Sequence, residues 1–256
     1  MTHFSTSAIV LQRRSYADFD LIVTVISRDY GKCTLIAKSA KKSIKRFSGG
    51  LEPFSQLQLV YRQGRSKDLF LLEESNIEHA FQAIRASVIK TAYASYWSEL
   101  VNLWIEPGQP NGEIFKLLAY ALEELDQDAK PESLINLLFL FRFIGNEGFQ
   151  PILGHCTSCQ CLIDDIHQPR LCFDLKQGGI VCRQCPSGSH TAIELSKGTL
   201  KQLQWMISQA PAVAERIKFS PLAISEATQF LDAFVPFHIG KTPKSLKFLK
   251  QVRPAI

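Results

Sequence analysis

The residues best suited to chemistry in this sequence are cysteines, and six of the seven lie between positions 156 and 185. Four of them form two C-x2-C pairs, Cys156 with Cys159 and Cys182 with Cys185, with 22 residues between the pairs. Paired thiols at this spacing are typical of a tetrahedral Zn²⁺ site. Because four thiolates leave no coordination position for water, we expect one structural zinc ion per chain and no catalytic metal.

Other groups beside the two pairs leave the ligand set open. Cys161 lies two residues beyond Cys159 and could replace it, and Cys172 is the sixth cysteine of the cluster. His155 and His190 flank the pairs, but we interpret both as neighbours because four thiolates already fill a tetrahedron. An iron–sulfur cluster also takes four cysteines. Two symmetric pairs across a hairpin favour a zinc ribbon instead.

The residues between the pairs have the pattern of a β-hairpin. Leu171–Asp174 forms one strand, Lys176–Gly179 the turn, and Ile180–Val181 the other strand. A segment of this length has little hydrophobic core of its own, so we expect the metal to hold it folded.

A second set of candidate functional residues is basic. It comprises Arg13, Arg14, Lys38, Lys41, Lys42, Lys45 and Arg46. The last five fall within nine residues, and no acid occurs between Asp29 and Glu52. We expect this loop to contact phosphates. Six nearby aromatic residues supply either stacking surfaces for bases or core: Tyr16, Phe19, Tyr30, Phe47, Phe54 and Tyr61.

The formal net charge of +5 is unevenly distributed. Residues 1–80 hold 12 Lys and Arg against 8 Asp and Glu, a charge of +4. Residues 81–150 hold 5 against 9, or −4, and residues 151–256 hold 12 against 7, or +5. Two basic ends suggest a polyanionic partner, most commonly nucleic acid. The acidic middle or the cysteine segment is better suited to protein partners.

The first 78 residues have the pattern of five short strands with turns between them. The expected strands are His3–Leu11, Leu21–Ser27, Lys32–Lys38, Leu57–Arg62 and Leu69–Glu73. Five strands are the number that an OB-fold barrel requires. The basic loop begins at Lys38, the end of the third strand, and continues into residues 39–55 before the fourth strand.

From about Ile77 the apolar residues recur every three or four positions, which predicts one long helix ending before Pro107. Further helices are expected over Glu113–Leu125, from Pro131 through Ile144, and in three later segments. These are a helix capped by Ser196 and ending at Ile207, then Pro221–Phe237 and Pro243–Val252. The fold class is therefore α+β. Residues 1–78 form a DNA-binding OB-fold, 79–153 and 188–256 a helical domain, and 154–187 an inserted zinc module with four cysteine ligands.

Several functional classes are excluded by what the sequence lacks. The apolar run at Leu134–Phe143 is far shorter than the about 20 residues of a membrane helix, and no secretory signal opens the chain. We therefore expect a cytoplasmic protein with no membrane partner. Neither a phosphate-binding loop nor a hydrolase or zinc-protease motif occurs. The acids at 123–128 fit a solvated turn, so we expect no catalytic residues and no enzyme.

Taken together, the motifs resemble the RecO family of bacterial recombination mediators. The N-terminal part of the resemblance comprises Ala8–Arg14, Asp20–Val23, Asp29–Lys32, Ala37–Lys42 and Leu51–Phe54. The two cysteine pairs with Gly178-Gly179 are similar to the family's zinc module, and Lys244–Leu249 is similar to its C-terminal segment. Each piece is short, but their order and spacing are specific.

The resemblance implies a non-enzymatic protein of DNA repair, associated with the nucleoid. Such proteins bind single- and double-stranded DNA and anneal complementary strands. With their partner RecR they help load RecA onto DNA covered by single-strand-binding protein, whose C-terminal tail they bind in the helical region. Some members lack the cysteines.

The alternative is a zinc-ribbon transcription or RNA-binding factor, which would contact nucleic acid through the ribbon itself. Within residues 154–187, however, Arg170, Lys176 and Arg183 are balanced by three aspartates. Four thiolates on Zn²⁺ would then add a charge of −2. A ribbon that binds nucleic acid should be basic, so we expect the loop Lys38–Arg46 to carry more of the DNA affinity.

Overall fold

The computed structural model describes residues 3–43, 45–47, 51–64, 69–185, 192–209, 211–214 and 216–254. The chain forms two compact units. The first comprises Met1–Lys130 with Pro243–Arg253, and the second Pro131–Thr242 with Pro254–Ile256. The division into three functional domains stays a prediction, because compactness alone does not say which segment carries which function.

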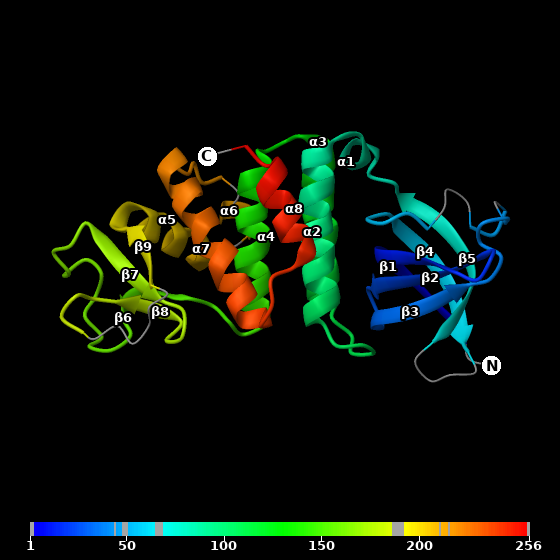
Figure 1. The fold of residues 1–256 in the computed structure, drawn as a ribbon, viewed down its shortest axis with the longest axis horizontal. Coiled ribbons are helices and arrows are strands. Elements are labelled where there is room, and N and C mark those ends of the chain that lie inside the picture. Colours follow the sequence, from blue (N-terminus) through cyan, green and yellow to red (C-terminus); the bar gives the residue numbers. More distant parts are fainter. Residues whose placement is uncertain are drawn as a thin grey trace. The chain divides into compact units, whose positions relative to one another are not determined.

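The N-terminal strands close into a barrel, which confirms the predicted OB-fold (Figure 1). They are β1 (His3–Tyr16), β2 (Asp20–Ser27), β3 (Gly31–Ala37), β4 (Gln56–Gln63) and β5 (Phe70–His79). The order around the barrel is β1-β2-β3-β5-β4, with β3 and β5 parallel and the other neighbours antiparallel. Burial alternates along β3 with the period of two that places every second side chain inside.

Strand β1 is longer than the predicted strand His3–Leu11, because it continues beyond the barrel core as far as Tyr16. A bulge between Val10 and Gln12 shifts its register against β2. Residues 6–11 are buried, whereas residues 12–16 are all exposed, although they remain paired with β2 as far as Tyr16 and Asp20. The β1–β2 hairpin tip, residues 12–20, therefore presents its side chains to solvent.

The single long helix expected after Ile77 is wrong. Strand β5 continues to His79, and the helical segment is divided into α1 (Gln82–Ala86) and α2 (Val88–Trp104). Ser87 breaks the helix because its backbone is extended, at φ −120° and ψ 126°, and its side chain accepts a hydrogen bond from the Lys90 backbone N–H. Apolar periodicity does not detect such a break, because it continues across Ser87.

Two of the acids at the end of α3 (Gly112–Gln127), Asp126 and Asp128, contact helices of the first unit. The interpretation of the acids at 123–128 as a solvated turn is therefore incomplete, although Glu123 and Asp128 are exposed as it predicted. Asp126 accepts a hydrogen bond from the Ile84 backbone N–H at 3.1 Å. Asp128 lies 2.6 Å from the ammonium of Lys90, whose side chain is only 6% exposed. A buried ammonium needs such a partner.

Helix α8 (Lys244–Val252) packs on α2 through Leu246 and Leu249. The side chain that caps it comes from α2. Glu99 accepts hydrogen bonds from the Lys244 N–H at 3.1 Å, the Ser245 N–H at 2.7 Å and the Ser245 hydroxyl. A carboxylate at a helix N-terminus stabilises the partial positive charge there.

The second unit combines helices with a small sheet. Its helices are α4 (Glu132–Asn146), α5 (Lys197–Ser208), α6 (Pro211–Ala214) and α7 (Pro221–Ile239). The sheet has the order β6-β8-β7-β9, formed by Ile152–Cys156, Gly179–Val181, Arg170–Asp174 and Ala192–Ser196. The predicted hairpin is the antiparallel pair β7–β8. Among the described helices, none is both long and apolar enough to span a bilayer.

Candidate metal centre and nucleic-acid interface

The sheet of the second unit brings the two cysteine pairs together. Cys156 is the last residue of β6, and Cys159 lies in the turn that follows. Cys182 comes directly after β8, and Cys185 three residues later. Strands β6 and β8 are parallel neighbours, so both pairs lie at the same end of the sheet. Pairing of β6 with β8, irregular between Ile152 and Cys156, thus positions residues that are 26 apart in sequence.

The geometry of the four thiols fits one metal ion. Their Sγ atoms all lie within 4.8 Å of one another, and those of Cys159 and Cys182 are 3.8 Å apart. A tetrahedron with Zn–S bonds of about 2.3 Å has sulfurs separated by about 3.8 Å. The Cys182 backbone N–H also points at the Cys156 sulfur, at 3.4 Å. The cluster could therefore hold a metal ion.

The thiols also influence one another's ionisation. Burial disfavours the Cys156 thiolate, but the backbone N–H groups of Cys159, Cys182 and Ser158 donate to it and lower its pKa to about 6. Contacts with the Cys182 and Cys159 thiols raise the pKa of Cys185 to about 12. A dication would make it possible for all four thiols to ionise together.

The alternative ligands lie outside the four-thiol group. Cys161 and Cys172 are half-buried free thiols, and Cys33 is buried in the barrel. Cys172 lines a hollow of about 370 Å³ that Cys182 and Cys185 also line. His155 is not part of the group, and His190 lies outside the described residues.

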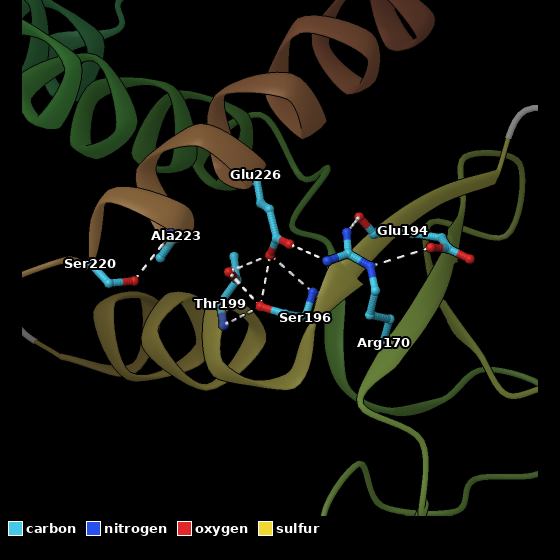
Figure 2. Close-up of polar contacts among 7 residues, drawn as sticks. All are labelled: Arg170, Glu194, Ser196, Thr199, Ser220, Ala223 and Glu226. Atoms are coloured by element: carbon cyan, nitrogen blue, oxygen red, sulfur yellow. Dashed lines mark hydrogen bonds and ion pairs between the residues drawn. The ribbon is translucent and has the colours of Figure 1, made fainter. Parts of the chain in front are cut away.

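A buried carboxylate ties this sheet to the helices of the second unit (Figure 2). Glu226 of α7, 6% exposed, accepts hydrogen bonds from the Ser196 N–H and hydroxyl at 2.9 and 2.8 Å. It also accepts from the Thr199 hydroxyl at 2.5 Å and from the Arg170 guanidinium at 2.7 Å. Arg170 is on β7, Ser196 ends β9, and Thr199 is on α5. Sequence spacing gave no signal for this network, because it joins residues up to 56 apart.

Replacing Glu226 by Ala should lower the free energy of unfolding by about 2–3 kcal/mol, since buried donors would lose their acceptor. Chemical denaturation measures the change. The matched control is Glu194→Ala, which removes the exposed partner of Arg170 at 3.3 Å and should cost about 0–1 kcal/mol. Equal losses for the two variants would contradict a structural role for the Glu226 network.

The Glu226 network also predicts how the free energy of unfolding depends on pH. Burial would raise the pKa of Glu226, but hydrogen bonds from Thr199, Ser196 and Arg170 outweigh it and hold the pKa below its ordinary value. Its stabilisation is therefore complete above the ordinary Glu pKa of about 4.3 and is lost as pH falls through the lower folded pKa. Between about pH 7 and pH 3, the wild type should lose more stability than Glu226→Gln. Parallel pH profiles would contradict this assignment.

The predicted basic residues gather beside the β1–β2 hairpin tip. A hollow of about 410 Å³ is lined by Arg13, Arg14 and Lys41, together with Ser15, Leu21, Ala40, Phe47 and Leu51. Lys38, Lys42, Lys45 and Arg46 are exposed on the adjoining loop. The structure thus brings Lys41 to the two arginines of β1, although they lie far apart in sequence.

Four of these cations already contact protein groups, and two of the four, Lys41 and Lys42, contact the β1–β2 hairpin tip. Arg13 lies 2.7 Å from Glu52, and Arg46 donates to the Lys38 carbonyl at 2.8 Å and contacts the Phe47 ring. The contacts of Arg13 and Arg46 stabilise the conformation of the basic loop. Of the six aromatic candidates, Phe47, Phe54 and Tyr61 are buried, whereas Tyr16, Phe19 and Tyr30 are exposed.

Comparison with known proteins identifies the family. The profile described as "Recombination protein O N terminal" matches residues 1–81, and "Recombination protein O C terminal" matches residues 85–247. The chain belongs to the RecO family. The protein named DNA repair protein RecO of Desulfatibacillum aliphaticivorans is 42% identical over 254 residues, covering 99% of this chain and 98% of the relative. This confirms the resemblance inferred from the motifs.

Other RecO proteins match over the same extent. The DNA repair protein RecO of Desulfosudis oleivorans is 37% identical over 99% of both chains. That of Syntrophus aciditrophicus is 34% identical over 98% of this chain and 96% of the relative. The barrel, the helices and the cysteine module therefore all fall within the part of the chain that the RecO relatives cover.

Proposed function

We propose that this chain is a non-enzymatic DNA-binding protein of recombinational repair. It binds single- and double-stranded DNA and anneals complementary strands. With RecR it helps load RecA onto DNA covered by single-strand-binding protein, whose C-terminal tail is a further partner. The observation that carries the proposal is the cluster of basic residues at one face of the OB-fold barrel, in a chain of the RecO family.

The chemistry of annealing fits such a surface. Two DNA strands repel each other through their phosphates, and Lys and Arg side chains lower this repulsion by neutralising phosphates and releasing counterions. No covalent bond changes, so neither a general base nor a nucleotide site is needed. The DNA-contacting residues that we propose are Arg13, Arg14, Lys38, Lys41, Lys42, Lys45 and Arg46, within a DNA-binding segment 1–78.

The ribbon of the second unit is less suited to contact DNA. Its Arg170 is held by Glu226 and Glu194, and its Asp164 pairs with Lys201 at 2.5 Å. We assign the segment 154–187 a structural role, with one Zn²⁺ ion bound by Cys156, Cys159, Cys182 and Cys185. When bound, the metal supplies a cross-link between two short strands that have little core of their own. Residues 79–153 and 188–256 form the helical part that surrounds this module in sequence.

Strand annealing tests the proposal. We expect the purified protein, with no nucleotide added, to speed the pairing of two complementary oligonucleotides, both alone and in the presence of single-strand-binding protein. Fluorescence energy transfer between labelled strands follows the reaction. An annealing rate equal to that of the strands alone, in both conditions, would contradict the proposal.

A further inference from the structure

The β1–β2 hairpin tip exposes two aromatic side chains that do not pack in the barrel core. Tyr16 is 51% exposed and Phe19 is 43% exposed. Large aromatic residues are usually buried, because each removes much apolar surface from water. Both residues follow the bulge at which β1 leaves the core, so the backbone itself directs them away from the barrel interior.

The basic loop holds this tip in one conformation. The Lys41 backbone N–H donates to the Phe19 carbonyl at 3.1 Å, and the Lys41 ammonium donates to the Asp18 carbonyl at 3.2 Å. The Ser39 N–H donates to the Asp20 carboxylate at 2.8 Å. Because both segments are ordered by these bonds, a ligand that binds across them loses little conformational entropy.

Aromatic and cationic groups lie together on this surface. The Lys42 ammonium lies 3.3 Å from the centroid of the Phe19 ring, a cation–π contact. Lys38 and Lys45 are exposed on the same loop. Asp18 is the opposing charge in the tip, since Asp20 already accepts from the loop. Exposed rings beside exposed cations complement a chain that carries both phosphates and flat bases.

We propose that Tyr16 and Phe19 form a stacking platform for unpaired bases, and that this platform makes the interface favour single-stranded over double-stranded DNA. The inference rests on the proposed function and specifies how that same surface distinguishes its two ligands. In a duplex the faces of the bases are covered by their neighbours, so only unpaired bases can stack on a protein ring. The lysines contact phosphates of either form.

The test compares Tyr16→Ala/Phe19→Ala with the wild type on a single-stranded oligonucleotide and on its duplex, by fluorescence anisotropy. Affinity for the single strand should fall about 10- to 100-fold, while affinity for the duplex changes by less than about threefold. The slope of log affinity against log salt should stay the same, because stacking releases no counterions. Trp205→Ala, which removes another exposed aromatic residue (40% exposed), should leave both affinities unchanged.

A second pair of variants separates stacking from general apolar contact. Phe19→Trp should keep single-strand affinity, and its added fluorescence, relative to the wild type, should be quenched by the single strand and not by the duplex. Phe19→Leu should lose affinity although it remains apolar. Melting temperatures equal to that of the wild type show that each variant is folded.

The outcomes distinguish this inference from the proposed function. Equal losses on both DNA forms, or no loss on either, overturn the stacking platform while DNA binding itself stands. Full DNA affinity combined with loss of binding to a protein partner would assign the aromatic tip to protein docking and also overturn it. A wild-type protein that binds neither DNA form would contradict the proposed function as well.

Discussion

Replacing Cys182 by Ser should release the metal ion and unfold the β6–β9 sheet. Cys182 is buried, its Sγ lies 3.8 Å from that of Cys159, and its N–H points at the Cys156 sulfur. A hydroxyl is a poor zinc ligand beside three thiolates. Structural zinc contributes on the order of 10 kcal/mol of binding free energy, which is also folding free energy. The loss should therefore far exceed the about 1 kcal/mol of an ordinary substitution.

Elemental analysis measures the metal content of each variant, and denaturation measures its stability. The wild type, purified without added metal, should contain about one zinc ion per chain, because one closed site holds four thiolates. Cys182→Ser should contain far less and should unfold at a lower temperature. Iron with a visible absorption band in place of zinc would contradict the assignment of the metal.

The matched control is Cys161→Ser, which removes a thiol two residues beyond Cys159 without touching the four-thiol group. It should keep the metal and most of the stability. Cys33→Ser tests a buried thiol in the barrel, where the expected loss is that of a core substitution only. If all three variants lost stability equally, the four cysteines would not be the ligand set.

The sequence predicts the cysteine cluster well because its geometry is mostly local. Each C-x2-C pair is one turn, and the hairpin β7–β8 is signalled by short apolar segments on either side of a turn that contains Gly178-Gly179. Only the proximity of the two C-x2-C turns depends on residues distant in sequence, and the pairing of β6 with β8 produces it. The sequence did not predict β6 or β9, because each pairs with a strand distant in sequence, β8 and β7, rather than across a local turn.

The barrel was predictable for a similar reason, whereas its hairpin tip was not. Short apolar and β-branched runs between turn signals indicated five strands, but the first run ended at Leu11, where the core ends, and β1 continues to Tyr16 as an exposed hairpin. Exposed strand residues need not be apolar, so their pattern resembles that of a loop. The ion-pair partners of the arginines could not be predicted either, because no spacing rule indicates that Arg13 pairs with Glu52 or that Arg170 binds Glu226.

Removing three lysines of the basic loop, as Lys41→Ala/Lys42→Ala/Lys45→Ala, should weaken DNA binding on the order of a hundredfold at about 0.1 M salt. Each phosphate contact contributes roughly 0.7–0.9 to the slope of log affinity against log salt, so three lost contacts should lower that slope by about 2–3. All three side chains are exposed. The fold should therefore be retained, which the melting temperature checks.

A control variant with the same change in charge must not replace cations that stabilise the fold. Arg170 is unsuitable because its guanidinium binds the buried Glu226, and its loss would destabilise the second unit. Lys116, Lys176 and Arg183 are exposed and lie on α3 and on the ribbon. Replacing these three by Ala lowers the net charge equally, so it measures the effect of the same charge loss away from the basic loop.

The control variant should lose less than about threefold in DNA affinity and keep its salt slope, because long-range attraction between exposed charges is screened beyond about 10 Å at 0.1 M salt. Local phosphate contacts, in contrast, are lost only when the contacting side chain is removed. Anisotropy titrations at about 50, 100 and 200 mM salt give both quantities for each variant. If the control weakened binding as much as the loop variant does, DNA affinity would arise from net charge and the barrel would not be the DNA surface. If the control weakened it more, the ribbon would be the main DNA contact, as in a zinc-ribbon transcription or RNA-binding factor.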